Sequence, residues 1–144
     1  MHLVVAAPLI GAVGVGIAIM ALTFALFYAP GPPRYTLTQD ALTIHDRFYP
    51  VTLPAEAVDV GSIQVVDFTA NPEWRPVRRT NGFSSMHYHS GWYRVAGGQK
   101  IRLYRADGKK LVLLPPRGTG SAVIFEAPEP ERFIADLKRA WNES

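Results

Sequence analysis

The chain opens with a long apolar run and then changes to short alternating segments. Residues 3–29 contain no charged side chain. About 20 apolar residues cross a hydrocarbon core of about 30 Å, and backbone groups in lipid must pair internally, so this run predicts one transmembrane helix. Pro30, Pro32 and Pro33 would end it. The predicted organisation is a transmembrane helix at 3–29, a Pro-rich joint at 30–34 and one domain at 35–142.

The segments after the joint predict a mostly β domain. Residues 35–38 and 41–45 alternate apolar and polar side chains around Gln39-Asp40, a pattern typical of a β-hairpin. Residues 68–91 hold Pro, Gly, Ser and Asn without a sustained period, so we expect a long loop with room for one short strand. Further strands are predicted at 48–53, 63–67, 92–95, 101–105, 111–114 and 122–125.

The last segment has helical periodicity. Phe133, Ile134, Leu137 and Trp141 recur on one face, and Pro130 stands at a favoured helix start. About seven short strands followed by this amphipathic helix describe a small barrel. The expected role of the helix is to cover an open end or face of the β core.

Composition limits the chemistry. The chain has 144 residues, no cysteine and a net charge of +3. It therefore has no disulfide framework, no thiolate zinc site and no thiol nucleophile. The mild positive charge is spread among acidic residues, so no nucleic-acid partner is expected.

A cleaved signal peptide is the alternative to a retained anchor. Such peptides have a basic start, a shorter apolar stretch and small residues before the cut, whereas Phe27-Tyr28-Ala29 is bulky and no Lys or Arg precedes the run. All 15 Lys and Arg follow the run. The positive-inside rule then predicts a single-pass protein of the cell membrane with a cytoplasmic C-terminal domain.

Small residues recur along one face of the predicted transmembrane helix. Such a stripe lets two helices approach closely in lipid, which predicts a homo-oligomer or a partner helix in the membrane. The alternative is that the stripe follows from composition alone, because Ala or Gly fill 10 of the positions from 3 to 29. The stripe comprises Ala7, Gly11, Gly14, Ala18, Ala21 and Ala25.

Several segments together resemble a known family. The hairpin order, the Arg79-Thr-Asn-Gly82 segment, the aromatic strand from Gly91 and the ending at 127–133 are similar to bacterial PH-like (pleckstrin-homology-like) domains, over roughly residues 35–141. The resemblance implies a PH-like split barrel closed by the C-terminal helix, and a membrane-tethered binding or scaffolding role. Phosphoinositide-binding PH domains carry Lys and Arg around their first hairpin, whereas this tip is Gln39-Asp40, which argues against such a site.

The segment around residues 74–88 supplies the candidate binding residues. The predicted anchor, the short joint and the absence of a catalytic pattern lead us to expect a membrane-associated protein partner. Arg side chains bind phosphate and carboxylate in forked geometry, so binding of anionic lipid headgroups by the Arg75–Arg79 loop is the alternative. A solvated loop with ion pairs to Glu73 or Asp67 is the simpler interpretation. Asn81-Gly82 favours a tight turn. The candidates are Trp74, Arg75, Arg78, Arg79, Asn81 and Tyr88.

His87 and His89 are the residues closest to a metal pattern. In an extended segment they point to the same side, but a third ligand is needed and His45 is the remaining histidine of the domain. A metal-dependent enzyme built on this pair is therefore the weakest alternative. No nucleophile elbow or phosphate loop occurs, so neither a cofactor nor catalysis is predicted.

Overall fold

The computed structural model describes residues 13–22 and 33–141, and residues 13–22 are helical. The remainder is mostly β, with three single 3-10 turns between strands. The elements are β1 (Arg34–Leu37), β2 (Ala41–His45), β3 (Val51–Pro54), β4 (Gln64–Asp67), β5 (Pro76–Ser84), β6 (His89–Val95), β7 (Lys100–Arg105), β8 (Lys110–Leu114), β9 (Val123–Phe125) and the helix α2 (Pro130–Ala140).

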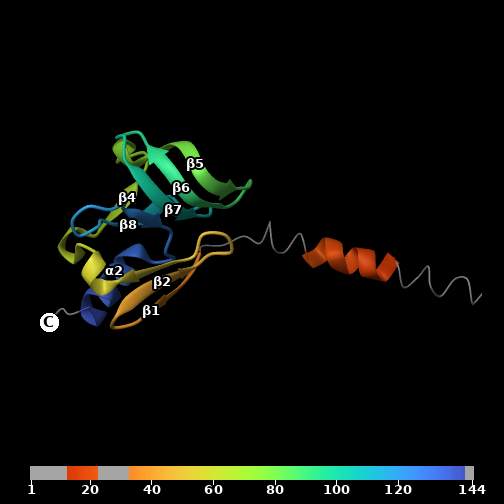
Figure 1. Ribbon diagram of the computed structural model, residues 1–144, viewed down its shortest axis with the longest axis horizontal. Helices are drawn as coiled ribbons and strands as arrows, with labels where there is room; N and C mark the ends of the chain where they lie inside the picture. Colours follow the sequence, from red (N-terminus) through yellow and green to blue (C-terminus); the bar gives the residue numbers. More distant parts are fainter. Residues whose placement is uncertain (1–12, 23–32, 142–144) are drawn as a thin grey trace, which may run out of the picture.

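The strands form two sheets. The smaller sheet has the order β1-β2-β3, and the larger has the order β4-β8-β9-β7-β6-β5. Figure 1 shows β5, β6 and β7 on one side of the domain, and α2 with β1 and β2 on the other. In the larger sheet β9 lies between β8 and β7 and pairs with β7 in parallel. The mostly β class predicted from the sequence is confirmed.

The first hairpin predicted from the alternating segments is present. Arg34 pairs with His45 and Leu37 with Leu42, so the first hairpin turns at the expected residues. The helix predicted after Pro130 is also present, and it buries Phe133 and Leu137.

The long loop predicted for residues 68–91 is wrong, because its second half contains β5 and the start of β6. The β5 strand pairs with β6 from Pro76 to Ser84, with register shifts on either side of Arg78 and Arg79. These irregularities, together with the polar side chains of an edge strand, removed the alternation that would have predicted it.

The tight turn predicted at Asn81-Gly82 is also wrong, since both residues lie within β5. Gly82 faces Gly91 across the strand pair, and Gly91 has φ +114°. A Cβ on Gly82 would lie 2.6 Å from the Ser90 carbonyl oxygen. Glycine is therefore required here for close approach of two backbones rather than for a turn.

One core cluster joins α2 to both sheets. Phe125 of β9 contacts Phe133 edge-to-face at 4.9 Å between ring centroids. Trp141 is buried and its indole N–H donates to the Thr38 carbonyl at 2.9 Å, fixing the end of the helix to the first hairpin. The cluster comprises Leu42, Ile44, Val58, Ile63, Tyr104, Val112, Leu114, Val123, Phe125, Ala127, Phe133, Leu137 and Trp141.

A second core cluster lies within the larger sheet and includes Tyr93 and Leu103, with Phe68 and Trp74 packed against it. Glu126, next to β9, connects this region to the turn after β7. Its buried carboxylate accepts the backbone N–H groups of Ala106 and Gly108 at 3.1 and 2.8 Å. These hydrogen bonds satisfy a buried polar group that would otherwise be costly.

The predicted transmembrane helix lies largely outside the described residues. Within 13–22 and 33–141, no helix is long and apolar enough to cross a membrane. Of the small-residue stripe, Gly14, Ala18 and Ala21 lie in the helix at 13–22 and are exposed. Ala7, Gly11, Ala25 and most of the joint at 30–34 lie outside the described residues.

Candidate functional site

A groove of about 420 Å³ lies over β5, β6 and β7. Four arginines and one histidine line it, and among the described residues that line it none is acidic. A concave site with one sign of charge concentrates ligands of the opposite sign. The groove, which we name the arginine groove, is lined by Phe68, Arg75, Pro76, Val77, Arg78, Arg79, Ser84, His89, Tyr93, Leu103 and Arg105.

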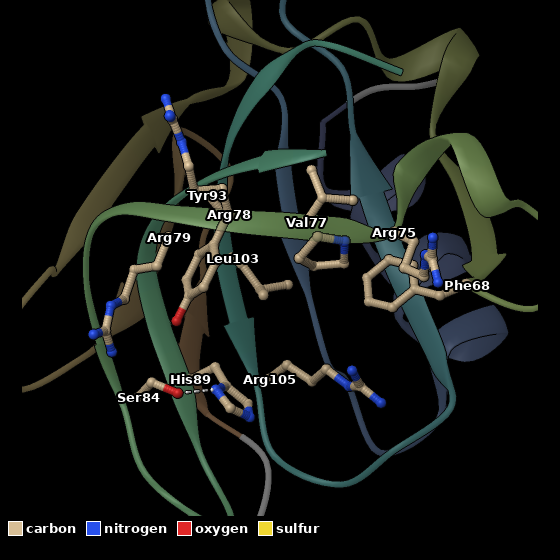
Figure 2. A pocket seen from close by; sticks show the side chains of 11 residues that line it. Phe68, Arg75, Val77, Arg78, Arg79, Ser84, His89, Tyr93, Leu103 and Arg105 are labelled. Atoms are coloured by element: carbon tan, nitrogen blue, oxygen red, sulfur yellow. Dashed lines mark hydrogen bonds between the residues drawn. The ribbon is translucent and has the colours of Figure 1, made fainter. Parts of the chain in front are cut away.

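Two of the four arginines, Arg79 and Arg105, stand on the strands on either side of β6, which carries His89. Arg105 ends β7 directly opposite His89 of β6. Arg79 stands on β5 between two register shifts. Figure 2 shows the Arg79 and Arg105 side chains on opposite sides of His89, whereas Arg78 extends away from it. A ligand beside His89 would therefore meet guanidinium groups from two directions.

The Arg105 side chain is held in place by its neighbours. Its guanidinium lies 5.3 Å from the centroid of the Phe68 ring, within cation–π range. Its Nε donates to the Gly108 carbonyl at 3.3 Å. Arg75 is positioned through its backbone, because its carbonyl accepts the Ala96 N–H at 2.8 Å. The held guanidinium of Arg105 therefore loses less conformational entropy when a ligand binds.

The floor of the groove is apolar. Leu103 is 1% exposed, and Tyr93 is buried with its hydroxyl donating to the Phe83 carbonyl at 3.1 Å. Burial raises the pKa of Tyr93, so this residue stays neutral. Val77 at the rim is 55% exposed. Arginines around apolar side chains suit a ligand that has both acidic and apolar groups.

His89 is the titratable group of the groove. Ser84 Oγ and His89 Nδ1 lie 2.6 Å apart. Burial lowers the pKa of His89, Arg105 and Arg79 lower it further, and Asp107 opposes them. The imidazole is therefore neutral at pH 7 and can gain a proton when an anion binds beside it.

Three of the six predicted binding residues line the groove together: Arg75, Arg78 and Arg79. The others lie elsewhere. Trp74 packs against the second core cluster. The Asn81 side-chain oxygen accepts the Tyr49 hydroxyl at 3.0 Å. The Tyr88 hydroxyl donates to Asp46 at 2.6 Å, and burial together with that carboxylate raises the pKa of Tyr88 well above its ordinary value.

The two histidines of the predicted metal alternative have different partners. His87 Nδ1 lies 3.4 Å from an Asp107 carboxylate oxygen, whereas His89 pairs with Ser84. Among the residues that the structure describes, no group of three or more His, Asp or Glu could hold a metal ion.

Sequence reasoning missed the part of the groove contributed by β6 and β7. Arg105 lies in a correctly predicted strand, but its place in the groove depends on pairing with His89. The sequence does not predict this pairing, because the loop expected at 68–91 includes His89 and the start of β6. Arg105 carries no sequence signal that sets it apart, because the same strand also contains Lys100 and Arg102.

Comparison with protein-family models, curated proteins and solved structures finds no match for this chain.

Proposed function

We propose that this chain is a membrane-anchored module that binds an acidic segment of a membrane-associated protein in the arginine groove. The observation that carries the proposal is the lining of that groove, which has four arginines and no acidic residue among those described. Guanidinium groups pair with carboxylates in bidentate geometry, which gives direction as well as affinity.

The partner segment that fits best is extended and mixes acidic with apolar side chains. The apolar floor would take the apolar groups, while Arg79 and Arg105 would take carboxylates on either side of His89. The groove also lies along β5, which is one of the two edge strands of the larger sheet. An edge strand can add an extended peptide through its backbone groups.

The anchor is the second part of the proposal. It is supported by the uncharged run at 3–29 and by the position of all 15 Lys and Arg after it. We propose a single-pass protein of the cell membrane with the domain on the cytoplasmic side. Self-association through the small-residue stripe belongs to the same proposal.

A PH-like split barrel remains part of the proposal. Two sheets that share one core cluster with α2 support it. The parallel pairing of β7 with β9 departs from a simple succession of hairpins.

A binding role is favoured over catalysis at the Ser84–His89 pair. A serine beside a histidine is the pairing that a nucleophile and its base make. The lowered pKa of His89 makes it a weak base, however, and its cationic neighbours oppose formation of imidazolium. Both features suit a site that takes up an anion.

The test is binding of a fluorescent peptide that alternates Glu with Val and Leu. The full chain is placed in nanodiscs of neutral lipid, and Arg79→Gln with Arg105→Gln is compared with Arg117→Gln, an exposed arginine outside the groove. Losing two charged partners should weaken binding by about tenfold or more, because charge-assisted hydrogen bonds contribute about 1.5–3 kcal/mol each. The control should stay within about twofold.

Two results would overturn the proposal. A peptide with Gln in place of Glu that binds equally well would exclude recognition of acidic groups. A second set of nanodiscs contains anionic lipid. If that lipid displaces the peptide, and the displacement is lost with the two groove substitutions, the groove would be assigned to lipid headgroups instead.

A further inference from the structure

Two exposed apolar side chains lie at one end of the domain. Met86, in the turn between β5 and β6, is 78% exposed, and Phe48, in the loop between β2 and β3, is 45% exposed. The Phe48 ring lies 5.0 Å from the ring of Phe83, and the Arg47 guanidinium lies 6.0 Å from the Phe48 centroid. Exposed apolar groups that gather on one surface mark a contact site.

The two loops are fastened to each other. The Tyr88 hydroxyl donates to Asp46 Oδ1 at 2.6 Å, and the Tyr49 hydroxyl donates to the Asn81 side chain at 3.0 Å. The other oxygen of Asp46 accepts the Tyr49 backbone N–H at 2.9 Å. Because these bonds tie the β2–β3 loop to the β5–β6 hairpin, the loop that carries Phe48 and the turn that carries Met86 are held at the same end of the domain.

The start of the folded domain lies at this same end. Arg34, the first residue of β1, pairs with His45, and the β2–β3 loop begins directly after His45. Five residues before Arg34, the uncharged run ends at Ala29. Five peptide steps reach at most about 18 Å even when fully extended.

That reach is short compared with a membrane. A bilayer of about 40–45 Å has a hydrocarbon core of about 30 Å, which leaves about 5–8 Å of headgroups on each side. If residues 3–29 span the bilayer, the loop beside Arg34 stands close to those headgroups. This step rests on the anchor of the proposed function.

We propose that the β2–β3 loop and the β5–β6 turn form a surface that contacts the lipid bilayer. Met86 and Phe48 enter the boundary between headgroups and acyl chains, and Arg47 stays at the level of the lipid phosphates. Ser84 and His89 form the last strand pair before the β5–β6 turn, so this contact orients the arginine groove with its His89 end beside the membrane.

The test uses the absence of native cysteine. Met86→Cys is made in the full chain, labelled with an environment-sensitive fluorophore and reconstituted in vesicles of phosphatidylcholine and phosphatidylglycerol. A matched Thr119→Cys variant reports on the opposite end. Thr119 precedes β9, whose first residue pairs with Arg102, whereas the other end of β7 pairs with His89.

We expect lipids that carry a nitroxide near the top of the acyl chain to quench the label at position 86 at least about twofold more than the label at 119. Equal quenching at both positions in a chain that stays with the vesicles after an alkaline wash would overturn the membrane contact and leave the anchor standing. Release of the chain by that wash would overturn the anchor, and the contact with it. The label at position 86 could instead escape lipid quenching and become more shielded from solvent as the protein density in the vesicles increases. That result would assign the surface to a second copy of the chain.

Discussion

The last two elements of the domain, β9 and α2, use their side chains differently from the strand β5. β9 is buried at all three residues, and α2 buries Phe133 and Leu137. In β5, residues 77–81 are all exposed. β9 and α2 stabilise the fold through buried side chains, whereas β5 exposes side chains that can contact a ligand. β9 and β5 belong to the same larger sheet, so this sheet supports β5 although few of the strand's own side chains are buried.

The largest effect on stability is expected from a cavity in the buried core around β9 and α2. Phe125→Ala removes a fully buried ring that packs against Phe133 and Tyr35. Large-to-small changes of this kind cost about 3–5 kcal/mol in the free energy of unfolding. Denaturant unfolding of the detergent-solubilised chain measures it. A loss below about 1 kcal/mol would mean that this packing contributes little to the fold.

A smaller effect is expected from crowding the hairpin backbone. Gly82→Ala would place a Cβ 2.6 Å from the Ser90 carbonyl oxygen, so the two strands must move apart. We expect a loss of about 1–3 kcal/mol, typical of overpacking. Gly61→Ala is the matched control, because its Cβ would meet only an Asp59 oxygen at 3.9 Å. The same unfolding assay should find the control within about 0.5 kcal/mol of the natural chain. Equal effects at the two sites would remove the close approach as a constraint.

The smallest effect concerns pH. The pKa of His89 is lowered in the folded chain, and an anion in the groove would raise it. Binding therefore takes up a proton, and affinity for the acidic peptide should increase about two- to fivefold between pH 8 and pH 5.5. His89→Gln should bind with little dependence on pH over this range. An unchanged pH profile in this variant would place the titrating group elsewhere.

The free energy of unfolding should depend on pH with the opposite sign to peptide binding, and through the same residue, His89. Because the pKa of His89 is lower in the folded than in the unfolded chain, the unfolded chain binds more protons between the two values. The contribution of His89 is fully present above the ordinary histidine pKa of about 6.5, and it is lost as the pH falls toward the folded value. Denaturation curves across pH 5–8, with and without His89→Gln, measure it. Stability that rises as the pH falls, and does so only in the chain with His89, would contradict this sign.

How far the sequence predicts this molecule depends on how regular each element is. Phe133 and Leu137 repeat at helical spacing, and residues 41–45 alternate strictly, so α2 and the first hairpin could be derived from pattern alone. The β5 strand could not, because its register shifts and exposed arginines erase the period of two.

The same irregularity limits how much of the arginine groove can be predicted from the sequence. Arg75, Arg78 and Arg79 stand close together in sequence, and their chemistry was evident. Arg105 and His89 join them only through strand pairing between β6 and β7. Trp74 was assigned to binding because it is aromatic and flanked by charge, yet it packs against the core. Sequence proximity is a poor guide to which side of a sheet a residue occupies.

The position of β9 has a consequence for how the domain is made. β7 and β8 follow each other along the chain but are joined in the sheet only through β9, which is just three residues long. On a ribosome, the hairpin that carries the arginines can pair as soon as it emerges, while the sheet remains in two unconnected pieces until residues 123–125 have been added. Completion of the sheet therefore waits for β9, and a nascent chain stalled before β9 would expose the apolar edges of both pieces to chaperones and proteases.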